Sequence, residues 1–133
     1  MESVVLVDSS VFIGLLRDGR DPARELVGRA ATTDLATCGM VRLEVVRGLT
    51  GSKQRRAFET FLSVLRNVPT DNRLWEEAAE MAWGLDRRGV TLPAQDLLIA
   101  CSALRIDAAV LTWDKHFFSI PNLRVFDSLD GLA

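Results

Sequence analysis

Four carboxylates stand where an apolar run ends or a helix begins, and this placement is the most informative feature of the chain. They are Asp8 in VVLVDSS, Glu44 in MVRLEVVRGL, Asp96 in LPAQDLLIA and Asp114 in VLTWDKHF. An acid beside a buried hydrophobic segment costs free energy, so it is usually kept for a cation or for chemistry. We therefore predict that the four side chains form one acidic, metal-binding site.

The chemistry open to such a cluster follows from its charge. Carboxylates packed together without a counterion repel one another, and some of them are then forced to hold a proton. Mg²⁺ or Mn²⁺ relieves this repulsion, because these hard cations prefer oxygen ligands, whereas zinc would need nearby His or Cys side chains. A divalent ion held by carboxylates supports metal-dependent hydrolysis of a phosphodiester bond.

Three further side chains lie close to these acids in the sequence. Ser10, two residues after Asp8, and Thr112, two residues before Asp114, are placed to hydrogen-bond the acids or a water on the metal. Helix capping explains Ser10 equally well. His116 is the single histidine, and we assign it a surface or supporting role rather than that of a general acid.

The charge balance bears on the substrate. The chain has 16 basic and 18 acidic residues, a net charge of −2, which argues weakly against a nucleic-acid partner. Metal bound to the four acids would offset that objection, and residues 42–56 contain five basic residues, Arg47 among them, against the single acid Glu44. A positive surface beside a metal site suits a phosphodiester, although a solvated helix face explains any one arginine as well.

The elements that must position these residues alternate between strand and helix. Short apolar, β-branched runs predict buried strands at 4–7, 35–37 and 109–111. Helical patterns cover 10–17, 22–31, 40–49, 53–65, 72–88 and 93–104. This alternation predicts an α/β fold with a parallel sheet, in which the loops after the strands gather along one edge. Asp8 and Asp114 follow strands directly, and we expect Glu44 and Asp96 to begin helices after strand-like pieces, the second of them at 90–92.

Two helices lead to predictions about surfaces. In the helix at 72–88, Trp75 and Trp83 are expected to be packing groups. The helix at 10–17 is apolar nearly all round, which predicts that part of it, including Leu15 and Leu16, is covered by a partner.

Length and composition set the remaining limits. With 133 residues, of which 48% are hydrophobic, we expect one domain spanning 1–133. No apolar stretch approaches ~18 residues, so we expect a cytoplasmic protein without a membrane segment. Cys38 and Cys101 lie apart within apolar segments, which indicates reduced core thiols.

These motifs together resemble the PIN-domain ribonucleases, and within them the VapC-type toxins of type II toxin–antitoxin systems. The resemblance rests on VDSSVFIGLL, on Glu44 followed by Arg47-Gly48-Leu49, on LPAQDLLIACSAL and on LTWDKHF, and it runs nearly end to end. It implies a PIN-like α/β/α sandwich with a central, mainly parallel sheet, usually a homodimer. It also implies cleavage of RNA with Mg²⁺ or Mn²⁺, and neutralisation by a small VapB-type antitoxin. The residues that match the family's acidic positions are Asp8, Glu44, Asp96 and Asp114, and Ser10 matches the polar position after the first acid.

Other functions fit parts of the pattern. A PIN nuclease of housekeeping RNA processing would have identical chemistry. A haloacid-dehalogenase-like phosphatase would need an acid where Ser10 stands, and a phosphoacceptor signalling domain would need a second acid beside Asp8. A catalytically inactive RNA-binding module would not require four intact acids.

Overall fold

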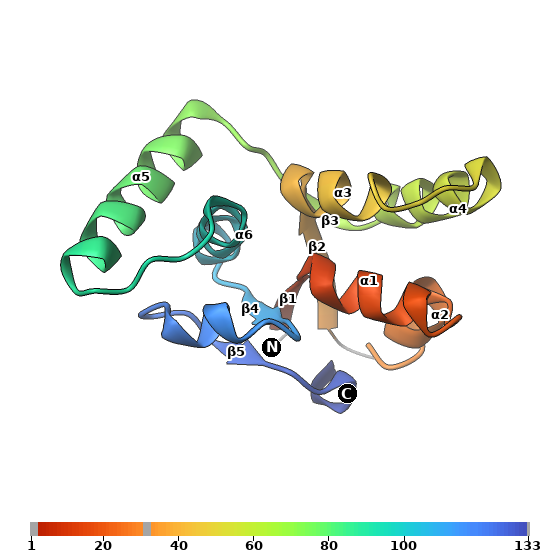
Figure 1. Cartoon of the computed structure of the whole chain (residues 1–133). Helices are drawn as coiled ribbons and strands as arrows, with labels where there is room; N and C mark the ends of the chain where they lie inside the picture. Colours follow the sequence, from red (N-terminus) through yellow and green to blue (C-terminus); the bar gives the residue numbers. More distant parts are fainter. Residues whose placement is uncertain (1–2, 31–32, 133) are drawn as a thin grey trace.

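A five-stranded parallel sheet forms the centre of the molecule. The computed structural model describes residues 3–30 and 33–132. The strands are β1 (Ser3–Val7), β2 (Thr33–Cys38), β3 (Arg66–Val68), β4 (Ala109–Leu111) and β5 (Val125–Phe126), in the spatial order β3-β2-β1-β4-β5. Each neighbouring pair is parallel, with Val5 opposite Leu35 on one side and Ala109 on the other. The predicted α/β class with a parallel sheet is confirmed (Figure 1).

Helices cover both sides of this sheet. They are α1 (Ser9–Arg17), α2 (Pro22–Val27), α3 (Gly39–Val46), α4 (Ser52–Ser63), α5 (Asn72–Arg87) and α6 (Ala94–Arg105), with short 3₁₀ helices η1 (Lys115–Ser119) and η2 (Leu129–Leu132). In Figure 1, α6 and the outlying α5 flank one side of the strands and α1 and α2 the other, while α3 packs on α1, α4 and α6. The end of the predicted helix 22–31 falls partly outside the described residues, and α2 itself ends at Val27. None of the helices within 3–30 and 33–132 is long and apolar enough to cross a membrane.

The strand predictions succeeded in the middle of the sheet and failed at its edges. The runs at 4–7, 35–37 and 109–111 correspond to β1, β2 and β4. Strands β3 and β5 were not predicted, because each is very short and β3 begins with two polar residues. The strand-like piece at 90–92 is wrong: these residues form an irregular connection between α5 and α6.

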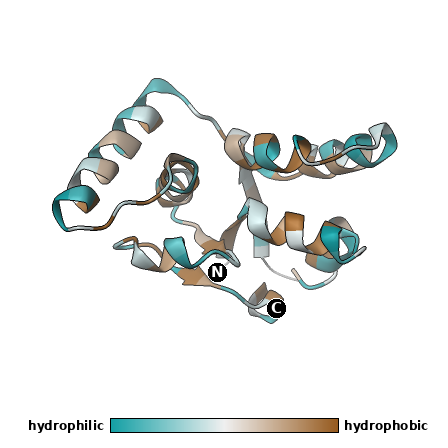
Figure 2. Ribbon diagram, in the orientation of Figure 1, coloured by the Kyte–Doolittle hydropathy of each residue, from teal (hydrophilic) through white to brown (hydrophobic). Residues whose placement is uncertain are grey.

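The core lies where the central strands meet α1, α4 and α6. Leu6, Val7, Val110 and Leu111 are completely buried, and Phe12 of α1 packs edge-on against the rings at the end of α4. Hydrophobic colours gather on β4, on the edge strand β5 and on α1 in Figure 2, and hydrophilic colours on the outlying ends of α4 and α5. Because both faces of the central strands are covered, continuous apolar runs are what this sheet requires.

Two expectations about surfaces need correction. Trp75 and Trp83 are 53% and 62% exposed, because α5 turns Leu74 and its helical neighbours toward α6 and leaves both indoles outside that stripe. Leu15 is completely buried in the core, so it offers no surface to a partner. Leu16, one residue on, is only half-buried and faces a groove.

Candidate active site

Asp8 is held by hydroxyl and amide donors at the carboxyl end of β1. It caps α1, and its buried side chain accepts hydrogen bonds at Oδ2 from the Ser10 amide (3.3 Å), from Ser10 Oγ (2.6 Å) and from Thr112 Oγ1 (2.9 Å). The strand pairing brings these groups together, since the Asp8 amide donates to the Leu111 carbonyl at 2.9 Å. The contacts expected of Ser10 and Thr112 with the first acid are therefore present. They fix the orientation of a carboxylate that has little room to rotate.

Glu44 approaches Asp8 through a residue that the sequence analysis did not single out. Ser9 Oγ lies 3.0 Å from Glu44 Oε1 and 3.4 Å from Asp8 Oδ1, so this hydroxyl bridges the two carboxylates. Glu44 does not begin its helix as expected but lies in the second turn of α3. Burial raises the pKa of Glu44; the Ser9 hydroxyl opposes this, the Asp8 and Asp114 charges add to it, and the charge of Arg47 lowers it again.

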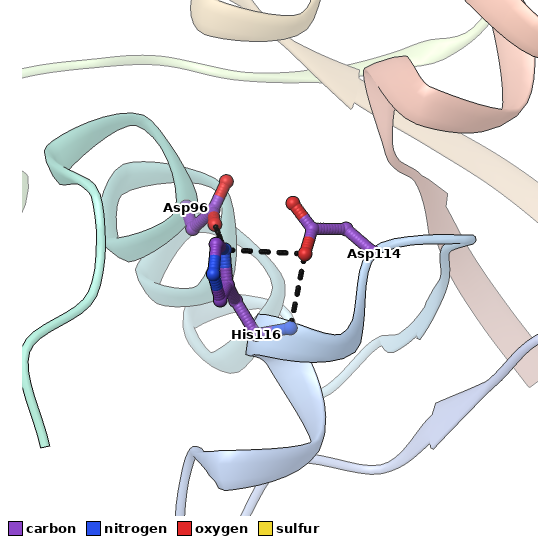
Figure 3. A group of neighbouring side chains, drawn as sticks. All are labelled: Asp96, Asp114 and His116. Carbon is purple, nitrogen blue, oxygen red and sulfur yellow. Dashed lines mark hydrogen bonds and ion pairs between the residues drawn. The ribbon is translucent and has the colours of Figure 1, made fainter.

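Asp96 and Asp114 meet across a shared histidine, as Figure 3 shows. Asp96 lies in the first turn of α6, and its Oδ2 is 2.9 Å from His116 Nδ1. Asp114 caps η1 by accepting the His116 amide at 3.0 Å, and its Oδ1 is 3.1 Å from the same Nδ1. Two carboxylate oxygens facing Nδ1 favour a proton on this nitrogen. The supporting role expected for His116 is thus a direct contact with two of the four acids.

Electrostatic coupling extends over the whole cluster. Burial raises the pKa of Asp96 to about 6, and the charges of Asp114 and Asp8 raise it while the hydrogen bond from His116 opposes them. The same hydrogen bond to Asp96, together with the Asp114 charge, raises the pKa of His116. Thr112 joins the two halves, because its Oγ1 donates to Asp8 and accepts the Asp114 amide at 2.9 Å. The charges of Asp8 and Asp114 therefore raise the pKa values of both Glu44 and Asp96, which links the two halves of the site.

This donor set fits a divalent cation. One oxygen or nitrogen from each of Asp96, Asp114 and His116 can be chosen so that all three atoms lie within 4.8 Å of one another. Because the pKa of Asp96 is raised to about 6, the surroundings disfavour its ionised form. A cation bound beside this carboxylate would stabilise the ionised form. The predominance of carboxylate oxygens suits Mg²⁺ or Mn²⁺.

Among the residues predicted to bind metal or substrate, Arg47 alone makes no side-chain hydrogen bond or ion pair with the acids within residues 3–30 and 33–132. It ends α3 as an exposed residue, and its charge reaches Glu44 only through space. Among the other basic residues of this stretch, Arg42 and Arg55 both pair with Glu59, so they are partly neutralised. The basic surface lies along α4 and along α3, which is the helix that carries Glu44.

Comparison with known proteins agrees with this geometry. The PIN domain family model matches residues 5–123. Ribonuclease VapC1 of Methanocaldococcus jannaschii is 29% identical over 117 residues, 88% of this chain and 80% of its own length. Ribonuclease VapC4 of Mycobacterium tuberculosis is 29% identical over 125 residues, 90% of this chain and 93% of its own length.

Solved structures show the same fold. The structure of VapBC2 from Rickettsia felis bound to a promoter DNA fragment superposes with a TM-score of 0.77 at 22% identity, covering 94% of this chain and 98% of that one. VapBC-1 from nontypeable Haemophilus influenzae gives a TM-score of 0.74 at 22% identity, covering 93% and 97%. With the family model covering most of its length, the chain belongs to the PIN domain family.

Proposed function

We propose that this protein is a metal-dependent endoribonuclease that acts as the toxin of a type II toxin–antitoxin pair. The observation that carries the proposal is the arrangement of four carboxylates, which follow β1 and β4 or lie on α3 and α6, around the hydroxyl groups of Ser9 and Thr112 and the ring of His116 at one edge of the sheet. The relatives named ribonucleases support RNA as the substrate.

In this proposal Asp8, Glu44, Asp96 and Asp114 hold Mg²⁺ or Mn²⁺. When bound to these carboxylates, such an ion would supply Lewis-acid chemistry, namely a more acidic water and positive charge beside the phosphate oxygens. The protein's own contribution is to hold the ligands in place. Ser10 and Thr112 fix the Asp8 carboxylate, and the hydroxyl that bridges Asp8 and Glu44 keeps those two side chains apart at a set distance.

Two basic side chains add positive charge at or near the acids. Nδ1 of His116 lies within hydrogen-bond distance of Asp96 and Asp114, and these carboxylates raise the pKa of His116, which favours the positively charged imidazolium beside the acids. Arg47, exposed at the end of α3, attracts the phosphate backbone of RNA toward the acids.

Cleavage of RNA by the purified chain is the direct test. We expect single-stranded or looped RNA to be cut in Mg²⁺ or Mn²⁺, to remain intact in EDTA, and to yield 5′-phosphate and 3′-hydroxyl ends. Asp8→Asn, Glu44→Gln and Asp96→Asn should each abolish cleavage without unfolding the protein, and Asp114→Asn should cost somewhat less. Activity that persists in EDTA, or cyclic-phosphate products, would refute the proposal.

The partner would be a VapB-type antitoxin, and the toxin itself would form a homodimer. A groove of about 310 Å³ between α1, α2 and α4 supports a peptide-binding surface, since its lining includes Leu16, Phe58 and Phe61 beside Arg20. A Leu16→Glu variant should associate more weakly with the antitoxin encoded beside this gene, measured by pull-down and by loss of RNase inhibition. Light scattering of the chain alone checks the homodimer.

A further inference from the structure

Trp113 combines exposure with rigid fixation directly beside the acidic cluster. It is 40% exposed although both of its neighbours hold the site together: Thr112 is completely buried, and Asp114 is partly exposed. Its backbone amide donates to Ser10 Oγ at 3.0 Å, and that same hydroxyl donates to Asp8 at 2.6 Å. The backbone of this tryptophan is therefore two hydrogen bonds away from the first acid.

The indole ring is fixed as firmly as the backbone. Nε1 donates to the carbonyl of Asp127 at 2.8 Å, which satisfies the only polar atom of the side chain. The ring lies against α1 at Gly14, where an added Cβ would stand 2.7 Å from Cε3 and closer still to Cζ3. Only glycine leaves room for this packing, so the sequence of α1 is adapted to the position of the indole.

This arrangement exceeds what a structural anchor requires. A tryptophan that only tied α1 to the segment after β5 would gain most from burying its ring, because burial of apolar area is what stabilises such contacts. Trp113 instead remains 40% exposed with the polar atom of its side chain already hydrogen-bonded. A ring held in this way can accept a stacked group without ordering anything further in the protein.

The place of Trp113 in the chain, directly before Asp114 and hydrogen-bonded to Ser10, indicates what stacks on its ring. In a single-stranded nucleic acid a base is attached beside every phosphate, so a phosphodiester bound at the acids places bases close to neighbouring protein surfaces. Exposed aromatic side chains stack on such bases whatever their sequence. We infer that Trp113 is a substrate-positioning residue, which stacks a base of the RNA next to the cleaved bond. This inference rests on the proposed RNase activity. It adds a residue that binds a base of the RNA, whereas the acids would act at the phosphodiester.

Kinetics with matched substrates test the inference. The substrates are a single-stranded RNA oligonucleotide that the wild type cleaves and the same oligonucleotide with abasic riboses flanking the cleaved bond. Trp113→Ala should raise KM for the first roughly 5- to 100-fold with little change in kcat, and Trp113→Phe should raise it less. The difference between wild type and Trp113→Ala should disappear on the abasic RNA. Trp75→Ala, which removes a similarly exposed indole from α5, is the matched control and should leave KM unchanged.

Gly14→Ala provides a second, independent variant. Its Cβ would displace the indole, so it should raise KM as Trp113→Ala does, and it should have no further effect when combined with Trp113→Ala. Thermal unfolding of each variant shows whether the fold is retained. An equal effect of Trp113→Ala on intact and abasic RNA, or a loss of stability with KM unchanged, would make Trp113 a structural anchor and overturn the inference. So would an unchanged KM with weaker binding of the antitoxin.

Binding can be followed without cleavage. In a variant carrying Trp75→Phe, Trp83→Phe and Asp96→Asn, Trp113 is the single tryptophan, and its fluorescence should be quenched by the intact oligonucleotide and not by the abasic one. If the wild type cleaves RNA but this base-dependent quenching is missing, the inference alone falls. If the wild type cleaves no RNA, the proposed function falls, and missing quenching would also overturn the role of Trp113.

Discussion

Removing the charge of Asp96 should stabilise the metal-free protein, although the same change abolishes the proposed activity. In Asp96→Asn the amide keeps the shape of the carboxyl and can still contact His116, whose Nδ1 lies 2.9 Å from Oδ2 in the wild type. What disappears is a negative charge in a buried position close to Asp114 and Asp8. The variant therefore isolates the electrostatic cost of assembling the site.

The size and pH dependence of the effect follow from the pKa of this carboxyl. Folding raises it from 3.8 to about 6, a value that already includes the favourable contact with His116. A shift of about 2 units corresponds to about 3 kcal/mol as an upper limit. Because the folded pKa is raised, the stability that Asp96 contributes is present below about pH 4 and is lost as the pH rises through about 6.

Urea denaturation in EDTA measures this directly. At pH 8 we expect Asp96→Asn to unfold with a free energy about 1–3 kcal/mol higher than that of the wild type, and near pH 4 we expect no difference. Asp34→Asn, which neutralises an exposed acid at the opposite end of the sheet, should change stability by less than about 0.5 kcal/mol at either pH.

Adding metal should reverse the order. Mg²⁺ at 100 times its dissociation constant stabilises a protein by about 2.7 kcal/mol, and the wild type should gain more of this than the variant, which lacks one ligand. A variant less stable than the wild type at pH 8 in EDTA would show that the Asp96 charge is structurally useful, and the reasoning would fail. The same conclusion would follow from a difference that does not change between pH 4 and pH 8.

Three further predictions concern other parts of the structure. Thr112→Val keeps the shape of the side chain but removes the hydroxyl that donates to Asp8 at 2.9 Å, so it should destabilise the protein by about 1–3 kcal/mol and lower RNase activity; denaturation and initial rates check this. Leu15→Ala should cost about 2–5 kcal/mol of unfolding free energy because Leu15 is completely buried, whereas half-buried Leu16→Ala should cost clearly less; equal losses in urea would contradict the assignment of Leu15 to the core. His116 is the single histidine, so its NMR titration is unambiguous: its pKa should lie above 6.5 in EDTA and fall when Mg²⁺ neutralises the acids, and a pKa unaffected by metal would separate His116 from the site.

The four acids could be selected from the sequence as candidate site residues because the signals that mark them are local. A carboxylate that follows a buried strand and precedes a helix is recognisable from adjacent residues, and Asp8 and Asp114 do cap the elements that follow them. Parallel topology then implies that such positions meet at one edge. Glu44 was identified as a member of the site, although its place in the second turn of α3 was not foreseen.

Contacts between distant segments could not be read in this way. Ser9 meets Glu44 across 35 residues and His116 meets Asp96 across 20, and no local pattern encodes either distance. A lone histidine two residues after an acid has no distinctive signature, since its partner is brought to it by α6. The packing of Trp113 on Gly14 belongs to the same class, because it depends on where α1 lies relative to the segment after β4.

By itself the sequence determined the fold class, the central strands and the helices, and it selected the four acids as candidates, because burial and capping act on neighbouring residues and produce recognisable local patterns. Only the tertiary structure decided that Leu15 faces the core and Leu16 a groove, that both indoles of α5 stay in water, and that β3 and β5 complete the sheet. A helix that is apolar nearly all round does not specify which of its faces is covered, and a strand of two or three residues is stable only when a neighbouring strand pairs with it. These outcomes depend on the free energy of whole elements packing together, which is a property of the assembled chain.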